Sequence, residues 1–291
     1  MKLEQVHWAT NRSRHWPQVL AFAFDHRAQF EEMCARLGTS PERIPHFKRL
    51  ALSAAMMTAN GRGDGGILLD GRFGQDALDH ATGKGLWIGR PVELPGSRPL
   101  RFEGGPDLGC TLRSWPAEHC VKCLVYYHPD DPEELCREQE AQVLILADAC
   151  RRTGHDLLLE VIPGKSQAPV DDTTLARAMA RFYALGVYPD WWKLPHPGSD
   201  SAWVQIGGEI ADNDPNCRGV LLLGLEAPEA ELMAAFAMAR RHPVCKGFAI
   251  GRTIFGKPAE EWLAGRIKDQ QAIQAMAAGY RRLIDAWESA A

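Results

Sequence analysis

The stretch Asp156-Leu-Leu-Leu-Glu160 is a short apolar run that ends in a charged residue, and a helix-like stretch leads from it to a second run, Asp190-Trp-Trp-Lys193. Neither run alternates between polar and apolar residues, which is typical of parallel strands that are covered on both faces. Strands that alternate with helices in this way indicate an α/β protein with a parallel sheet.

Eight such runs recur along the chain, and helix-like or loop-like stretches separate them. The runs are Val19–Phe24, Gly66–Leu69, Leu86–Val92, Val121–Tyr126, Asp156–Leu159, Asp190–Trp192, Val220–Leu223 and Gly247–Ile250. They recur about every 32 residues, close to the ~31 residues per unit of a (β/α)8 barrel. The sequence therefore predicts a single (β/α)8 TIM barrel over roughly residues 18–256, within one domain of residues 1–291.

Helix boundaries carry the residues that favour helix ends. Polar or proline residues precede four helical stretches, at Ser40-Pro41, Asp131-Pro132, Asp172 and Pro228. Polar side chains accept hydrogen bonds from the free backbone N–H groups of the first helical turn, and proline has no N–H group that would need a partner there. Residues 93–119 are rich in proline and glycine, which predicts a long loop with a short helix. Residues 258–288 are predicted to form one long C-terminal helix.

The charge balance excludes several classes of partner. The chain has 33 basic and 37 acidic residues, and its hydrophobic content of 45% supports a full-sized core. No basic cluster is available to neutralise nucleic-acid phosphates or to bind a membrane surface. No apolar stretch is long enough to span a bilayer, and the first 18 residues lack the apolar core of a signal peptide. We therefore expect a cytoplasmic protein without nucleic-acid or membrane partners.

The eight cysteines are expected to be reduced thiols, because the chain shows no secretion signal. Cys120 and Cys123 have the C-x-x-C spacing of a metal site. They lie on a predicted strand, however, where side chains three residues apart point to opposite faces. The sequence therefore predicts neither a metal nor another cofactor.

Charged residues stand at the ends of six of the predicted strands. They are Asp25, Asp70, Glu93, Lys122, Glu160 and Lys193. Catalytic groups of a (β/α)8 barrel lie where the strands end, because the loops that follow the strands form the active site there. We therefore expect these side chains to converge, although any one of them alone suits a structural ion pair.

Lys193 is the candidate nucleophile. It follows two tryptophans, Trp191 and Trp192, whose rings we expect to exclude water from the amine. A lysine that is desolvated beside a second cation has a lowered pKa and can form a Schiff base with a ketone. Lys122 supplies that second cation or holds a substrate oxygen, and Glu160, one strand away, is the candidate acid/base group.

Three further residues near strand ends suit subsidiary roles. Asp25 offers another acid/base group, and Arg27 offers a cation for an anionic substrate, whereas Asp70 suits a backbone hydrogen bond equally well. Lys165 is the rival nucleophile, but it lies on a glycine loop several residues past its strand, where we expect it to be exposed. Glu93, His26 and His196 receive no definite role.

The last two strands end in residues that suit a phosphate group. Gly224 follows the seventh run, and Gly251-Arg252 follows the eighth. Backbone amides at these two places form the usual phosphate site of the fold, and the planar guanidinium of an arginine matches phosphate oxygens. The sequence therefore predicts that Gly224, Gly251 and Arg252 bind the substrate.

Six motifs extend in order over nearly the whole predicted barrel. They are Asp25-His-Arg27, Leu68-Leu69-Asp70, Val121-Lys122-Cys-Leu-Val-Tyr-Tyr, Leu159-Glu160, Trp192-Lys193-Leu-Pro and Gly247-Phe-Ala-Ile-Gly251-Arg252. Together they resemble the strand ends of class I aldolases of the tagatose-1,6-bisphosphate and sulfofructose-phosphate aldolase type. The resemblance implies that Lys193 forms the Schiff base, that Glu160 and Lys122 move protons, and that the glycine and arginine of the last motif bind phosphate.

Two motifs, Asp25-His26-Arg27-Ala-Gln-Phe and Asp70-Gly-Arg-Phe-Gly, are most similar to the aldolase-like domain that is often fused to 5-dehydro-2-deoxygluconokinase in inositol catabolism. That resemblance implies cleavage of 5-dehydro-2-deoxygluconate 6-phosphate to dihydroxyacetone phosphate and malonate semialdehyde. Two features differ from the tagatose-type pattern: the seventh run continues as Leu-Gly-Leu-Glu226, and His196 follows Pro195.

The sequence leaves other functions open. One alternative is an aldolase for another ketose phosphate, and a second is a metal-assisted lyase with Asp25, Asp70, Glu93 and Glu160 as ligands. A third is a non-catalytic barrel that binds a sugar phosphate and regulates a kinase. The sequence also leaves open whether the protein forms a homo-oligomer or works with a fused or partner sugar kinase.

Overall fold

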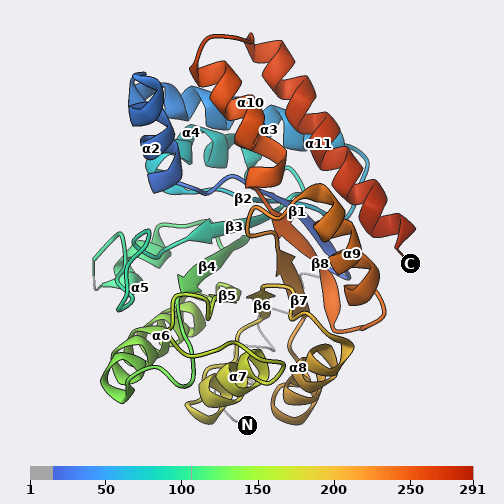
Figure 1. Ribbon diagram of the computed structural model, residues 1–291. Helices are drawn as coiled ribbons and strands as arrows, with labels where there is room; N and C mark the ends of the chain where they lie inside the picture. Colours follow the sequence, from blue (N-terminus) through green and yellow to red (C-terminus); the bar gives the residue numbers. More distant parts are fainter. Residues whose placement is uncertain (1–15, 106, 291) are drawn as a thin grey trace. The chain divides into compact units, whose positions relative to one another are not determined.

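The computed structural model describes residues 16–105 and 107–290, and it contains a closed barrel of eight parallel strands in the order β1 to β8 (Figure 1). The strands are β1 Val19–Ala23, β2 Gly65–Leu68, β3 Trp87–Pro91, β4 His119–Val125, β5 Leu157–Val161, β6 Trp191–Leu194, β7 Gly219–Leu223 and β8 Cys245–Ile250. Each of the eight predicted runs coincides with one strand, so the prediction of a (β/α)8 TIM barrel is confirmed.

Helices follow the strands. They are α2 Ala28–Leu37, the short 3₁₀ helix Pro41–Arg43, α3 Ile44–Ala59, α4 Gly71–Ala81, α5 Leu108–Arg113, α6 Glu133–Thr153, α7 Thr174–Ala184, α8 Asp200–Asn213, α9 Glu229–Ala239, α10 Arg252–Leu263 and α11 Asp269–Ser289. Between β3 and β4 the chain forms only the six-residue helix α5, as the prolines and glycines of that region predicted.

Complete burial explains why the strands read as unbroken apolar runs. Every residue of β1, β2, β5, β6 and β7 is buried. Parallel strands in a barrel are covered by helices on one face and by the barrel interior on the other. A charged residue within such a strand is therefore unusual, which makes Lys122, Glu160 and Lys193 informative.

The C-terminal segment differs from its prediction. Residues 258–288 were predicted to form one helix, but α10 ends at Leu263 and α11 begins at Asp269. Gly265 between them adopts a left-handed backbone with φ of 73°, a conformation that glycine favours. The backbone N–H of Lys268 then donates to Gln271 Oε1 at 2.9 Å, which caps α11. The prediction of one helix was wrong. Helix-forming residues stand on both sides of this short turn, so the break at Gly265 was overlooked.

The backbone contacts divide the chain into two compact units. The first contains Val92–Leu222 and Arg241–Lys246, and the second contains Gln18–Pro91, Leu223–Arg240 and Gly247–Ala291. In the second unit α11 packs against α3 and α10 (Figure 1). In the first, α5 packs against α6 and α7 against α8. The single domain over residues 1–291 stays a prediction.

None of the helices in residues 16–105 and 107–290 combines the length and the apolar composition that a membrane crossing requires.

Candidate functional site

Four charged residues form a cluster in the first unit. Lys122 lies in β4, Glu160 in β5 and Lys193 in β6. Glu93 follows β3 by two residues and forms an isolated antiparallel β-bridge with Phe102. The strand register places Glu160 opposite Lys193. Sequence analysis predicted that Lys122, Glu160 and Lys193 meet, and the structure brings them together. Glu93, which was expected to converge with them but received no definite role, joins the cluster. Asp25 and Asp70, also expected to converge, belong to the second unit.

The cluster is a continuous chain of alternating charges. Lys193 Nζ donates to Glu160 Oε1 at 2.8 Å, and the other oxygen of Glu160, Oε2, lies 3.0 Å from Lys122 Nζ. Lys122 Nζ also donates to Glu93 Oε1 at 2.9 Å. The second oxygen of Glu93 accepts a hydrogen bond from the backbone N–H of Leu124 at 3.1 Å. Glu160 therefore bridges two amines.

The cluster is almost completely removed from water. The four side chains are only 4–8% exposed, and Lys193 has the largest exposed fraction. Burying a charge is costly unless it is paired and hydrogen-bonded, and here two ammonium groups are balanced by two carboxylates. A proton that passes from Lys193 to Glu160 leaves both of these groups neutral, while Lys122 stays paired with Glu93.

The two tryptophans before Lys193 have different positions from those predicted. Trp192 Nε1 donates to Tyr183 Oη at 2.8 Å, and its ring contacts Tyr183 and Phe182 of α7. Trp192 therefore packs on the helix side of β6. Because side chains alternate along a strand, Trp191 shares the face of Lys193. The prediction that both rings shield the amine was wrong for Trp192.

The cysteines behave as buried thiols. All eight are free, and burial raises the pKa of Cys120 and of Cys123 well above the ordinary value of 9.0. Both side chains are therefore neutral thiols. Within the part of the chain that the structure describes, no three or more His, Cys, Asp or Glu residues are arranged to hold a metal ion.

A different buried lysine lies in the second unit. Lys48, within α3, forms an ion pair with Asp70, and both side chains are completely buried. Lys48 Nζ also donates to the backbone oxygen of His26 at 2.9 Å. Asp70 Oδ2 accepts from the backbone N–H of Phe73 at 2.8 Å, so Asp70 caps α4. Asp70, predicted as a substrate-binding residue, has two structural partners here.

Sequence analysis did not identify Lys48. The signal was nevertheless present, because Ile44, Lys48, Ala51 and Ala55 occur at the spacing of one helix face, and such a stripe is usually apolar and buried. All four residues are buried in α3. A lysine on the apolar stripe of a helix requires a buried acid, and Asp70 is that acid.

Asp25 and Arg27 are also buried in the second unit, with 5% and 3% of their surface exposed. His26 Nδ1 lies 3.8 Å from Asp25 Oδ1, and the His26 ring meets the edge of Phe255 at 5.1 Å. The acid/base role of Asp25 and the substrate-binding role of Arg27 stay predictions.

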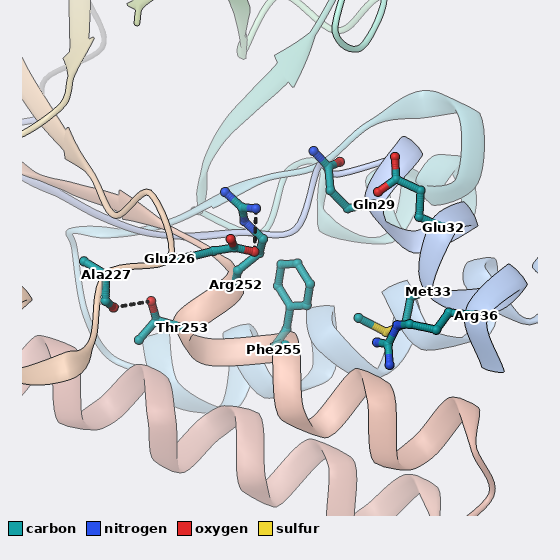
Figure 2. A pocket seen from close by; sticks show the side chains of 10 residues that line it. Gln29, Glu32, Met33, Arg36, Glu226, Ala227, Arg252, Thr253 and Phe255 are labelled. Atoms are coloured by element: carbon teal, nitrogen blue, oxygen red, sulfur yellow. Dashed lines mark hydrogen bonds and ion pairs between the residues drawn. The ribbon is translucent and has the colours of Figure 1, made fainter. Parts of the chain in front are cut away.

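Arg252, the predicted phosphate ligand, lines a pocket of about 600 Å³ in the second unit (Figure 2). Its Nη1 lies 2.5 Å from Glu226 Oε1, and Thr253 Oγ1 donates to the backbone oxygen of Ala227 at 3.4 Å. Leu225 and Glu226 adopt positive φ angles of 44° and 62°, which is uncommon outside glycine. An anion that binds Arg252 must therefore compete with Glu226.

The two predicted phosphate glycines have a packing explanation. A Cβ atom at Gly251 would collide with the backbone oxygen of Ala23 and the ring of His26. At Gly224 it would lie 3.1 Å from Ile250 Cγ2. The close approach at these glycines is therefore to neighbouring protein atoms of the same unit, and their role in phosphate binding stays a prediction.

The barrel and the charged cluster define the class of this protein: a TIM barrel with lysines and carboxylates buried on its strands. Residues 1–291 match the family described as "Uncharacterized protein conserved in bacteria (DUF2090)", and the chain belongs to this family. Its fold is similar to that in the crystal structure of Cgl0159 from Corynebacterium glutamicum. That likeness has a TM-score of 0.56 and 16% identity and covers 96% of this chain and 93% of the other. No curated protein matches the sequence.

Proposed function

We propose that the protein is a class I, Schiff-base aldolase and that Lys193 is its nucleophile. The observation that carries this proposal is the hydrogen bond from Lys193 Nζ to Glu160 Oε1 at 2.8 Å, in a buried cluster with a second lysine. A nucleophilic amine needs an adjacent group that accepts its proton. Glu160 lies within hydrogen-bond distance of this amine. The transfer leaves Lys193 and Glu160 neutral, and Lys122 stays paired with Glu93.

In the first half of the reaction, the neutral amine of Lys193 attacks the ketone carbon of the substrate. A nitrogen–carbon bond forms, and the former carbonyl oxygen takes up a proton to give a carbinolamine. Glu160 then protonates this hydroxyl, water leaves, and a protonated imine remains on Lys193. Glu160 thus changes from base to acid, a role that its hydrogen bond to Lys193 permits.

In the second half, a base removes the proton from the hydroxyl group two carbons from the imine carbon. The adjacent carbon–carbon bond breaks, and its electron pair moves into the protonated imine to give an enamine. An aldehyde leaves. Protonation of the enamine carbon and hydrolysis by one water molecule then release the ketone product and restore the Lys193 amine. No external oxidant or reductant is needed.

The substrate that we propose is 5-dehydro-2-deoxygluconate 6-phosphate, with dihydroxyacetone phosphate and malonate semialdehyde as products. This choice rests on the sequence motifs that the chain shares with the kinase-fused aldolase-like domains. Arg252, Gly251 and Gly224 are the proposed phosphate ligands. Another ketose phosphate of the tagatose or sulfofructose type is the alternative substrate.

The partners of the carboxylates favour this chemistry over a metal-assisted lyase. Glu93 and Glu160 both contact Lys122, and Asp70 contacts Lys48. Each of these three proposed metal ligands is therefore already neutralised by an ammonium group. Lysines between the carboxylates suit Schiff-base formation, whereas they would repel a divalent cation.

Borohydride trapping tests the proposal directly. The protein is incubated with dihydroxyacetone phosphate and sodium borohydride, which reduces an imine to a stable secondary amine. We expect one reduced triose phosphate per chain on the peptide that contains Lys193, and no adduct in Lys193→Ala. Lys84→Ala is the matched control, because Lys84 is exposed on the turn after α4, and this variant should label normally.

The variants are compared with the wild type by thermal melting, so that loss of labelling is not confused with unfolding. Labelling of Lys122 in place of Lys193 would keep the Schiff-base mechanism and reassign its nucleophile. A protein that cleaves the substrate without forming any trapped adduct would rule out the class I mechanism.

A further inference from the structure

The Lys165 side chain lies over an aromatic ring in the first unit. Its Nζ is 3.9 Å from the ring centroid of Tyr126, a position in which the ring face attracts the ammonium group. Tyr126 directly follows β4, and Lys165 lies in the loop between β5 and α7. Lys165 is exposed, as the sequence predicted. An ammonium group has three donors, so N–H groups remain for a ligand.

Tyr126 lies on the face of β4 that carries the charged cluster. Side chains alternate between the two faces of a strand, so Lys122, Leu124 and Tyr126 share one face. Leu124 and Tyr126 are half-buried, whereas Cys123 and Val125, on the opposite face, are almost completely buried. At Leu124 and Tyr126 this face is the more exposed of the two.

The strand register gives the height of this ring above the cluster. Leu124 pairs with Glu160, and Glu160 pairs with Lys193, so these three residues share one level. The backbone N–H of Ile162 donates to the oxygen of Val125 at 3.1 Å, which extends the pairing toward Tyr126. Tyr126 is two residues beyond Leu124, about 6.6 Å along the strand.

The loop that carries Lys165 is held by a buried carboxylate. Asp131 accepts hydrogen bonds from Arg98 Nη2 at 2.6 Å, Ser166 Oγ at 2.8 Å and the His128 backbone N–H at 3.1 Å. Arg98 Nη1 also donates to the backbone oxygen of Lys165 at 2.9 Å. Although burial opposes it, these bonds hold the pKa of Asp131 below its ordinary value of 3.8. Three loops are thus tied together, and the backbone of Lys165 is fixed.

We propose that Lys165 binds the substrate carboxylate and makes the enzyme selective for keto-sugar acids. The assignment rests on the proposed function, in which the ketone carbon bonds to Lys193. In 5-dehydro-2-deoxygluconate 6-phosphate the carboxylate carbon is four carbon–carbon bonds from the ketone, and bonds of ~1.5 Å give it a reach of about 5 Å. That reach brings it toward the level of Tyr126, where the Lys165 amine can donate to it. The phosphate is attached one carbon from the ketone and stays closer to Lys193.

The test compares two aldehydes in the condensation direction. Dihydroxyacetone phosphate is combined with malonate semialdehyde, which carries the carboxylate, or with propanal, which is similar in size but uncharged. We expect Lys165→Ala to lower the ratio of kcat/KM for malonate semialdehyde to that for propanal by about 10- to 100-fold, as loss of a hydrogen bond to a charged group predicts. The loss should appear mainly in the KM for malonate semialdehyde. Lys165→Arg should restore most of the ratio, and the control Lys84→Ala should keep the wild-type ratio.

Two outcomes would overturn the assignment. An unchanged ratio in Lys165→Ala, or equal loss with both aldehydes, would give Lys165 no role toward the carboxylate. A selective loss of dihydroxyacetone phosphate relative to unphosphorylated dihydroxyacetone would assign Lys165 to the phosphate instead. If the wild-type protein traps the triose on Lys193 and the ratio does not change, only the carboxylate assignment fails. If it traps nothing, the aldolase proposal fails first.

Discussion

Two buried lysines of this protein, Lys193 and Lys48, have opposite surroundings. Lys48 and its partner Asp70 are completely buried, and the amine also donates to the backbone of His26. Lys193 keeps 8% of its side chain exposed, and its partner Glu160 is shared with a second lysine, Lys122. Both amines are paired with a carboxylate. Lys193 alone keeps part of its side chain exposed, and its carboxylate partner also contacts a second lysine.

The difference separates an ion pair that stabilises the fold from one that is suited to chemistry. If Lys48 lost its proton, the Asp70 charge would remain buried beside a neutral amine, which is costly. If Lys193 transfers its proton to Glu160, both groups become neutral and Lys122 stays hydrogen-bonded to Glu93, so no buried charge is left unpaired. In the proposed mechanism, the exposed fraction of Lys193 and the second lysine beside its acceptor distinguish it from Lys48.

The largest expected effect is on turnover, from Glu160→Gln. The amide keeps the shape of the side chain but cannot accept a proton from Lys193, so kcat should fall about 10²- to 10⁴-fold, the usual contribution of general acid–base catalysis. Steady-state kinetics measures this fall in kcat. Asp70→Asn is the matched substitution in the completely buried Lys48–Asp70 pair. A Glu160→Gln variant with near-normal kcat would remove the distinction between the two pairs.

Lys48→Met should affect stability rather than chemistry. Removing one partner of a buried ion pair leaves an uncompensated charge and costs about 3–5 kcal/mol in the free energy of unfolding. Urea denaturation measures this value. The double variant Lys48→Met/Asp70→Asn should recover part of the loss, because asparagine still caps α4 and no charge remains.

If the double variant proves no more stable than Lys48→Met, the cost does not come from the Asp70 charge. Variants that remain folded should still label Lys193 in the borohydride experiment.

Lys122→Met should have an intermediate effect. Lys122 lies between Glu160 and Glu93 and contacts both carboxylates, so it orients them. A small misplacement of a catalytic group can lower the rate about 10²-fold. We expect a fall of about that size in kcat, with Lys193 still labelled by borohydride at a lower rate. Lys122→Met/Glu93→Gln should be less impaired than the separate losses predict, because Glu93 acts through Lys122.

The smallest expected effect concerns pH and His196, two residues beyond β6. Burial lowers the pKa of His196 below its ordinary value of 6.5, and its buried Nδ1 has no hydrogen-bond partner among the described residues. The unfolded chain therefore takes up this proton more readily than the folded protein does. The resulting loss of stability begins as pH falls below about 6.5 and continues toward the folded pKa.

Melting temperatures at pH 7.5 and pH 5.5 measure this effect in the wild type and in His196→Gln. The drop between the two pH values should be smaller in the variant by a degree or so, since roughly 2–4 °C corresponds to 1 kcal/mol in a protein of this size. An equal drop in both proteins would mean that other groups set the acid sensitivity.

Two contacts could be predicted from the sequence, because each depends on where a residue stands relative to the end of a strand or the start of a helix. Glu160 and Lys193 end neighbouring apolar runs, and parallel strands that are adjacent in a barrel align their ends. The register that pairs them is therefore the expected one. The cap of α4 by Asp70 follows from position in the same way, as an aspartate directly before a helix.

Other contacts depend on how helices and loops pack, and a one-dimensional pattern does not contain that information. Lys48 reaches Asp70 across 22 residues because α3 buries one particular face. Arg252 meets Glu226 because the loop after β7 adopts a left-handed turn. Strand alternation separates Trp191 from Trp192, but only the packing of α7 shows that Trp192 is the one that contacts Tyr183.

The sequence by itself determined the barrel, its eight strands and the three charged residues Lys122, Glu160 and Lys193 that are buried on them. A strand that is buried on both faces is an uninterrupted apolar run in the sequence. A charged residue within or directly after such a run is therefore easy to recognise. Only the tertiary structure decided which charges pair, among them Glu93 with Lys122, and that Lys165 lies over Tyr126. Side-chain partners are chosen by distances of a few ångströms, and packing sets those distances.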